Sequence, residues 1–375
     1  MKHWVTLLLC LCLGAQAMAQ GGVKALVKKV GTMIDSMSVK GVDRQYIDAP
    51  KKPWQIIARE NINQSSVNMR TAGTIDGVDY RARPHLKTEP AHYVGLWAGY
   101  RGYGLGYTVN VGGDKGSYLT LGATGGAYGL NMRVHSFENN TPNFDMNSDI
   151  IPEEDKDEWR QMHLTSPIKV HTLIADGYYL FNGKHFSYAA AYDQSVLQKR
   201  SAGSLMAGAM YYYAHIDYAS HTNGDLIYMM HGLGRVKLWQ GSVGVGYAYN
   251  WVPTHGLLVS MIAMPMFTFV NKIRAYGYGT NVPQLMENPL FWSKDITDDE
   301  WDDWFYGSLR IAPMGKKTFN SNVALNFDAR LSLTYNFERF FVNVYGQFNN
   351  NRYQHHSSHG HLNAWFINTS VGVRL

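Results

Sequence analysis

Cysteine is almost absent from this chain of 375 residues, which contains only Cys10 and Cys12. Both lie in an apolar stretch, residues 5–13, that follows a short polar start and precedes the sequence AMA at residues 17–19. This pattern is typical of a secretory signal peptide, so we expect residues 1–19 to be cleaved before Gln20. The mature chain would then hold no cysteine, and we expect neither a disulfide nor a thiolate metal site.

Long hydrophobic runs are missing as well. Beyond the signal peptide no stretch reaches the ~20 unbroken apolar residues that a membrane helix needs, and the nearest, residues 257–270, contains Pro265. A helical membrane protein is therefore excluded. The formal net charge is only +5 and is dispersed along the chain, so we do not expect nucleic acid as a partner.

Motifs for catalysis and cofactor binding are also lacking. The sequence GYGLG at residues 102–106 is not followed by the lysine or the helix of a nucleotide-binding loop. Neither H-E-x-x-H nor G-x-S-x-G occurs. We therefore predict no catalytic residue, no cofactor and no metal site, and we favour a non-enzymatic role.

The chain is instead rich in aromatic residues and in segments of alternating polarity, with 25 Tyr, 15 Phe and 10 Trp. In residues 322–335 one set of alternate positions is apolar: Val323, Leu325, Phe327, Ala329, Leu331, Leu333 and Tyr335. The positions between them are mostly polar, and residues 340–349 and 365–375 repeat the pattern. Strand side chains alternate between two faces, so this pattern predicts an all-β fold: a transmembrane antiparallel up-and-down β-barrel with a polar lumen. A soluble β-sandwich is disfavoured because the apolar rows continue over too many strands.

About twelve strands are expected, with ten or fourteen as alternatives. In chain order they are a strand from Gln55, residues 73–85, 92–110, 117–135 and 168–182, a strand from His185, and residues 203–219, 241–252, 257–273, 322–335, 340–349 and 365–375. In the strand from His185, Phe186, Tyr188, Ala190 and Tyr192 would share one face. The domain division is a signal peptide (1–19), a periplasmic lead-in (20–53) and the barrel (54–375).

The connections differ in length. Short turns at residues 253–256 and 336–339 are typical of the periplasmic side, which makes the long loop at residues 276–317 extracellular. In the N-terminal half this alternation fails, because the long loop at 136–167 would be periplasmic and the tight Asn182-Gly183 turn external. We infer that the strand count is uncertain in that half.

Both long loops contain an acidic, Trp-bearing segment with a helix-start signal. Pro152 begins the first, within residues 151–159, and Thr297 with Glu300 forms a capping box in the second. Each is either a solvated loop helix or a lid or plug that folds into the barrel mouth.

Two passages carry a resemblance to a known family. VDRQYIDAPKKPWQIIARENINQ at residues 42–64 and QKRSAGS at residues 198–204 resemble the Bacteroidota envelope proteins grouped as domain of unknown function 4421. The resemblance spans the mature chain. It implies an outer-membrane barrel and brings neither a known activity nor catalytic residues.

Charged side chains inside a membrane barrel are candidate functional residues. Asp328 and Arg330 share the predicted lumen face, and Arg374 lies one hairpin away. They either line a constriction that selects by charge or form a salt-bridge network that fills a narrow lumen.

Histidines supply two further candidates. His215 and Asp217 lie on one face of residues 203–219 and are either polar lumen lining or the base and its orienting carboxylate in a hydrolase. Four further histidines lie close together in one predicted extracellular loop and either bind a transition metal or are only solvated: His355, His356, His359 and His361.

The sequence thus predicts an outer-membrane β-barrel of unknown cargo, either a narrow channel or a binding and structural barrel. The alternative is an outer-membrane hydrolase that modifies lipid or lipopolysaccharide. The expected partners are outer-membrane lipid, the barrel-assembly machinery, and a small solute or ion in the lumen.

Overall fold

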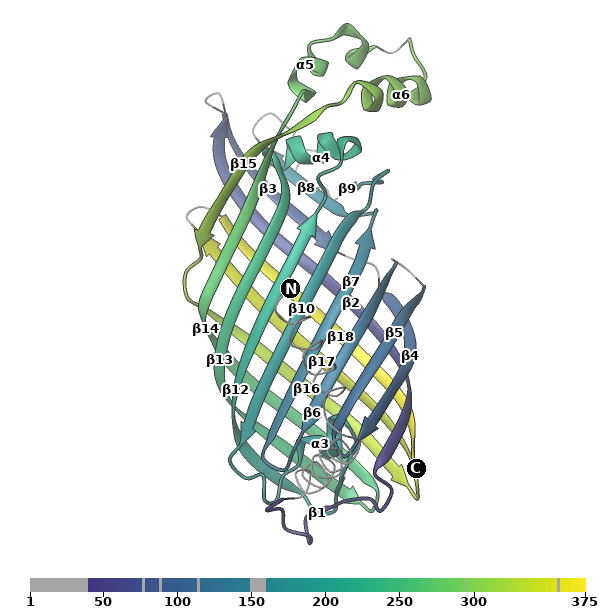
Figure 1. Cartoon of the computed structure of the whole chain (residues 1–375). Coiled ribbons are helices and arrows are strands. Elements are labelled where there is room, and N and C mark those ends of the chain that lie inside the picture. The colour runs from purple at the N-terminus through teal and green to yellow at the C-terminus, as the bar shows by residue number, and fades with distance from the viewer. Residues whose placement is uncertain are drawn as a thin grey trace, which may run out of the picture.

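The computed structural model describes residues 40–75, 78–87, 90–112, 115–148, 160–293, 295–355 and 358–375. Twelve strands form one closed antiparallel barrel, in which β18 returns to pair with β2 (Figure 1). The barrel strands are β2 (Trp54–Ile75), β4 (Ala91–Tyr100), β5 (Tyr103–Gly112), β6 (Gly116–Thr124), β7 (Tyr128–Asn139), β10 (Ile168–Leu180), β12 (Ala202–Asp217), β13 (Leu233–Thr254), β14 (Leu257–Thr280), β16 (Ala324–Phe337), β17 (Phe340–His355) and β18 (Ser358–Arg374). The predicted barrel of about twelve strands is confirmed.

One end of the barrel has four short turns and the connection at residues 181–201, and the longest connections leave the other end (Figure 1). Hairpins at residues 100–103, 124–128, 254–257 and 337–340 lie at the first end, where the C-terminus also lies. Short turns mark the periplasmic side, so the long connections are extracellular. The connection at 140–167 is also extracellular, which restores the alternation that the sequence pattern had broken.

Further strands extend the wall beyond the closed barrel. On the extracellular side β3 (Val78–Lys87) pairs with the far part of β2, followed by β8 (Asn143–Ser148) and β9 (Arg160–Gln161), and β15 (Ile311–Asn320) pairs with β14. At the periplasmic end β1 (Ile47–Asp48) pairs with β11 (Leu197–Gln198).

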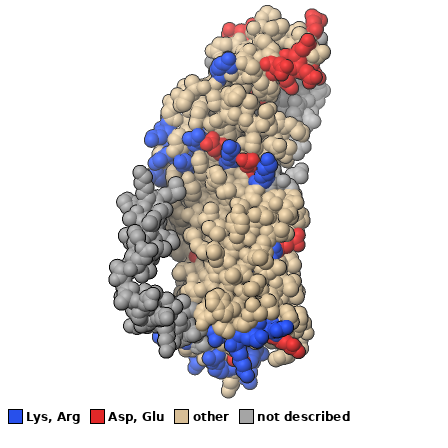
Figure 2. Space-filling model, turned by 45° about the vertical axis from the view of Figure 1, so that its right-hand side comes forward, with Lys and Arg blue, Asp and Glu red and all other residues tan. Residues whose placement is uncertain are grey.

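The two faces of the wall differ as a membrane barrel requires. On β16 Leu325 is 59% exposed and Leu331 is 56% exposed, whereas Asp328 between them is fully buried. On the face seen in Figure 2, Lys and Arg gather mainly toward the two ends of the wall and leave a zone with few charges between them. A closed barrel leaves no unpaired strand edge in lipid, and this apolar outer belt with its polar interior places the protein in the outer membrane.

Two glycine-rich runs expected as single strands are each two strands. Residues 92–110 contain β4 and β5, joined at Arg101 and Gly102, both with positive φ (52° and 90°). Residues 117–135 likewise divide into β6 and β7. Residues 73–85 are not a wall strand of the closed barrel, because they form the end of β2 and most of β3.

The prediction of a strand from His185 is wrong. This connection between β10 and β12 forms the helix α3 (Tyr188–Tyr192), whose five residues are all buried. Ser187 caps it, since its Oγ accepts a hydrogen bond from the Ala190 N–H at 3.3 Å. The count of twelve is still correct. Two predicted strands, at residues 73–85 and from His185, are not barrel strands, and two others, at residues 92–110 and 117–135, are each two strands.

An extracellular lobe stands between β14 and β15. It contains α5 (Val282–Met286), η3 (Pro289–Trp292) and α6 (Asp298–Ser308) around a small core of its own, and Figure 1 shows it beyond α4 (Gly224–Met229). The predicted capping box is confirmed: Thr297 Oγ1 accepts from the Glu300 N–H at 3.3 Å, and Glu300 Oε2 accepts from the Thr297 N–H at 2.9 Å.

Some predictions fall on residues that the structure does not describe. They are the signal peptide, residues 20–39 of the lead-in, and the acidic segment at 151–159. Among the described helices, none is both long enough and apolar enough to span a bilayer.

Candidate functional site

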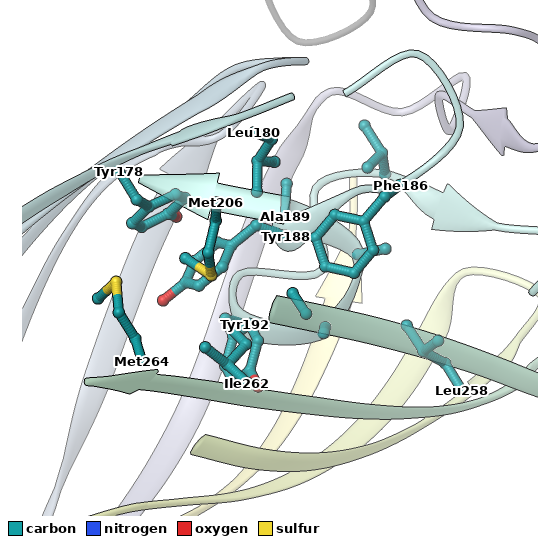
Figure 3. Packing of buried hydrophobic residues seen from close by; sticks show 14 of the residues in the cluster. Tyr178, Leu180, Phe186, Tyr188, Ala189, Tyr192, Met206, Leu258, Ile262 and Met264 are labelled. Carbon is teal, nitrogen blue, oxygen red and sulfur yellow. The ribbon is translucent and has the colours of Figure 1, made fainter. Parts of the chain in front are cut away.

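The connection at residues 181–201 folds into the periplasmic end of the barrel and carries α3 inside the lumen. We call residues 184–196 the plug. Tyr188 and Tyr192 of the plug stack at 4.4 Å, and Tyr178 of β10 lies 4.2 Å from Tyr188. Figure 3 shows these rings surrounded by wall side chains such as Met206 and Met264. The apolar positions at 186–192 are thus a core between plug and wall.

Wall side chains also hold the backbone of the plug. The last carbonyls of a helix lack partners within the helix, and here the wall supplies them. The donors are Ser332 Oγ at 2.7 Å and Asn343 Nδ2 at 3.1 Å to Ala191 O, and Gln55 Nε2 at 2.7 Å and Arg374 Nη2 at 2.9 Å to Gln194 O. Four strands of the wall, β2, β16, β17 and β18, therefore fix the plug.

A buried charge cluster lies directly above the plug. Arg330 Nη2 lies 2.8 Å from Asp328 Oδ2 and 3.1 Å from Asp176 Oδ2, and Arg330 Nη1 donates to Tyr188 Oη at 2.6 Å. Gln347 Nε2 donates to Asp328 Oδ1 at 2.9 Å. The predicted pair of Asp328 and Arg330 does meet inside the lumen, and the cluster joins β10, β16, β17 and the plug.

Arg374 faces the lumen as expected but belongs to a different place. Besides Gln194 O, its Nη2 donates to Asn336 Oδ1 at 2.7 Å, and its guanidinium lies 4.6 Å from the Phe341 ring. It therefore fastens the last strand to the plug at the periplasmic end. None of the contacts found for it in the described residues reaches Asp328 or Arg330.

Above the charge cluster, side chains from opposite walls fill the lumen. Tyr212, Ala214 and Leu238 pack in one apolar cluster with Tyr353 and Leu362 from the facing side. An amide network lies beside it. Its members are Gln240, Asn271, Asn326 and Asn351, joined through Asn326 Nδ2 to Gln240 Oε1 and to Asn351 Oδ1, both at 3.2 Å, and through Gln240 Nε2 to Asn271 Oδ1 at 3.2 Å.

The helix α4 covers the extracellular mouth. Its Leu226 and Ile227 are buried in a cluster with Ile168 and Ile216 of the wall. Asp225 of the same helix accepts a hydrogen bond from Tyr306 Oη of the lobe at 3.4 Å. Burial raises the pKa of the Asp225 carboxyl above its ordinary value, and burial together with this carboxylate raises the pKa of Tyr306 to about 12.

The cavities found between lumen-facing side chains of the described residues are small. Three cavities lined by lumen-facing side chains have volumes of about 70, 40 and 20 Å³. A single water molecule needs roughly 10–15 Å³ on this measure, so the smallest cavity holds about one water and the other two hold a few each. The middle cavity borders both the charge cluster and the plug, including Arg330 and Tyr192.

The lumen assignment of His215 and Asp217 is wrong, because both lie on the outer face of β12. The alternate residues Tyr212, Ala214 and Ile216 are the buried, lumen-facing ones. Outside, His215 Nε2 lies 3.9 Å from Asp217 Oδ2, and Arg235 Nε of β13 lies 2.8 Å from the same oxygen. The strand continues past the lipid zone, where its outer face is polar too, so polarity no longer identifies the lumen side.

Two outward-facing residues beside His215 were not singled out from the sequence. Ser136 Oγ of β7 lies 2.8 Å from His171 Nδ1 of β10, and the His171 ring lies 6.1 Å from the His215 ring. The register explains this row, since Ser136 pairs with His171 and His171 pairs with His215.

Most of the histidine-rich loop falls outside the described side chains, so the metal-site prediction stays a prediction. His356 lies outside the described residues, as do the side chains of His355 and His359, and His361 is exposed. No group of three or more metal-ligating side chains occurs in the described part of the chain.

The family model described as "Domain of unknown function (DUF4421)" matches residues 41–374. No curated protein matches the chain. Among solved structures, the outer membrane protease OmpT of Escherichia coli is 7% identical with a TM-score of 0.41, covering 86% of this chain and 97% of its own. The translocator domain of the autotransporter NalP of Neisseria meningitidis is 8% identical with a TM-score of 0.32, covering 95% and 98%. At these scores neither structure bears on what this chain does.

Proposed function

The chain belongs to the family described as Domain of unknown function (DUF4421), and from that premise we propose that it is a closed structural and binding barrel of the outer membrane rather than an open pore. The observation that carries this proposal is the filled lumen. The plug, the charge cluster, the apolar cluster around Tyr212 and the helix α4 succeed one another from the periplasmic end to the mouth.

The contacts of the plug support a fixed state rather than a mobile gate. Its carbonyls accept wall hydrogen bonds, its tyrosines are buried in the wall core, and Tyr188 bonds the buried Arg330. Charge-assisted hydrogen bonds such as the last one are roughly twice as strong as neutral ones. Moving the plug would break all of these contacts together.

The lobe is the part that favours a binding role outside the cell. Trp292 is 66% exposed and Leu290 is 41% exposed on its surface, although both flank its core. Exposed apolar side chains with a polar surround are typical of interaction sites. Asp298, Asp299 and Glu300 at the start of α6 add acidic side chains to the same lobe.

Conductance of the purified full-length barrel in a planar bilayer tests the proposal. We expect no discrete current steps from protein whose folding is checked by its heat-modifiable gel mobility. A second protein, with residues 184–196 replaced by a glycine-serine linker, tests the alternative of a narrow channel gated by the plug. That variant should stay silent because Tyr212 and Tyr353 still fill the lumen above it. Steps in the wild type would refute the closed barrel, and steps in the variant alone would favour the gated channel.

A lipid hydrolase is the second candidate, and the contact of 2.8 Å between Ser136 Oγ and His171 Nδ1 on the outer wall favours it. A serine activated by a histidine is the usual nucleophile of such enzymes. It ranks second because no carboxylate in the described residues contacts His171. Release of fatty acid from phospholipid vesicles, abolished by Ser136→Ala, would support it. A wild-type rate equal to that of protein-free vesicles would remove it.

A further inference from the structure

The outer wall at the extracellular end carries a concentration of cations on neighbouring strands. We call Lys169, Arg235, Lys237, Lys272, Arg274 and Lys316 the basic patch. They lie at outward positions of β10, β13, β14 and β15, and the register places Arg235 and Lys237 beside Tyr276 and Arg274 of β14. Glu138 and Asp217 are the acidic residues in the same rows, so the patch has an excess of positive charge.

Few of these cations are neutralised within the protein. Arg235 is paired with Asp217 at 2.8 Å, whereas no ion pair occurs for Lys169, Lys237 or Arg274 among the described residues. Arg274 Nε donates to the Thr318 hydroxyl at 3.2 Å, which leaves its charge uncompensated. The patch is therefore available to an anion from outside.

Aromatic side chains lie directly below the patch. The Arg274 guanidinium is 5.3 Å from the Trp239 ring, and Tyr213 packs beside Trp239 at 5.7 Å. Both rings point outward on β12 and β13. Such aromatic girdles mark the level where lipid headgroups meet acyl chains, so the basic patch lies at the height of the headgroups.

Below the rings, β10, β12, β13 and β14 form one part of an open groove that continues across β7, β6 and β5. We call it the outer groove. Its floor consists of small residues, Ala175, Gly177, Ala209 and Gly241, and its sides include Leu130 and Phe269. The volume is about 830 Å³ and the lining is almost entirely apolar. Lipid contact alone requires only that the outer wall be apolar. The small residues between larger ones also make a recess in that wall, which lipid contact does not require.

Patch and groove are aligned along the strands. His171 of β10 and Lys237 of β13 are at the same height, with His215 of β12 between them. Ala175 of the groove comes four residues after His171 on β10, which is roughly 13 Å farther along the strand. A lipid standing upright beside the wall would hold its headgroup in the patch and one acyl chain in the groove. The patch spans four strand spacings from Lys169 to Lys316, about 19 Å, which is wider than a single phosphodiester headgroup requires.

We propose that this face binds one phosphorylated glycolipid of the outer leaflet. Its phosphate would contact Lys237 and Arg274, its sugar would lie over Trp239, and an acyl chain would occupy the outer groove. Ammonium and guanidinium groups are the usual protein partners of phosphate. The site is on the outside of the wall and is independent of whether the lumen is closed.

Native mass spectrometry of the detergent-purified, full-length protein with added bisphosphorylated lipid A tests the proposal. We expect one bound lipid A on the wild type. The triple variant Lys169→Gln, Lys237→Gln, Arg274→Gln should bind it at least about tenfold more weakly, since each basic residue near an anionic lipid contributes on the order of a fivefold change. Ala209→Phe, which fills the groove floor without adding charge, should also weaken binding.

A matched control removes three cations at the periplasmic end, with Lys184→Gln, Lys199→Gln and Arg200→Gln, and should bind lipid A as the wild type does. Dephosphorylated lipid A and phosphatidylglycerol should both bind more weakly than lipid A to the wild type. Equal binding by the wild type and the patch variant would overturn the proposal, as would an equal loss in the control. Stronger binding of phosphatidylglycerol would overturn the choice of a glycolipid.

Discussion

Arg330 is the cation on which two buried carboxylates depend, and its removal should cost much of the stability of the barrel. Its side chain is 5% exposed, and those of Asp328 and Asp176 are 1% and 10% exposed. Arg330→Met keeps the volume but leaves both carboxylates without their partner. Breaking a buried pair on one side costs about 3–5 kcal/mol, and the lost hydrogen bond to Tyr188 adds ~1 kcal/mol.

The assay is urea unfolding of the protein refolded into lipid vesicles, followed by tryptophan fluorescence. The free energy of unfolding should fall by about 4–6 kcal/mol in Arg330→Met. Adding Asp176→Asn and Asp328→Asn should restore most of it, because the cost comes from uncompensated charge rather than from a missing contact. Arg352→Met on the exposed outer wall should stay within ~0.5 kcal/mol of wild type. The reasoning is refuted if Arg330→Met costs less than ~1 kcal/mol, or if the triple variant is less stable than the single one.

Three further predictions concern the mouth, the wall and the lobe. Because burial raises the folded-state pKa of Asp225, its ionised form destabilises the fold above that pKa; Asp225→Asn should therefore raise the urea midpoint at pH 8, and the gain should vanish as the pH falls toward ~4. A Cβ at Gly95 would collide with backbone of β5, whereas one at Gly346 has its nearest neighbour at 3.8 Å; Gly95→Ala should cost about 1–3 kcal/mol in the same assay and Gly346→Ala far less. Thr297→Ala removes the cap of α6 and should weaken the lobe by ~1 kcal/mol, seen as faster amide exchange in α6 alone and not in the barrel strands.

The barrel could be predicted from the sequence because lipid imposes a strict alternation on every strand that crosses it. Residues 322–335 show this best. The odd-numbered positions from Leu325 to Tyr335 point outward and the even-numbered positions from Asn326 to Thr334 point inward, as expected. The glycine-rich runs hid the turn at Gly102, since glycine is as common within these strands as at their ends.

The plug could not be predicted, because the evidence for it looks like evidence for a strand. Phe186, Tyr188, Ala190 and Tyr192 alternate with smaller residues, yet every residue of α3 is buried, since wall surrounds the helix on all sides. Asp176 was missed for a related reason. The lumen face of β10 near it is apolar where it packs against the plug, as at Tyr178 and Leu180, so the usual contrast between faces is lost.

His215 shows the limit of the polarity rule. Beyond the lipid zone both faces of a strand meet water, and a polar row then indicates the end of the membrane rather than the lumen. The correct signal was available in Lys169, Lys237 and Arg274, which are outward residues within two neighbouring rows of β10, β13 and β14.

Labelling of a single cysteine inside the lumen tests the closed barrel most directly. In a protein with Cys10 and Cys12 replaced by alanine, Ser332→Cys, buried beneath Ala191 of the plug, would be the only thiol. In folded protein it should react with a small charged thiol reagent at least about a hundredfold more slowly than exposed Asn320→Cys, because only the thiolate at an accessible site reacts, and urea should abolish the difference. Equal labelling rates at the two positions in the folded protein would contradict a filled and plugged lumen.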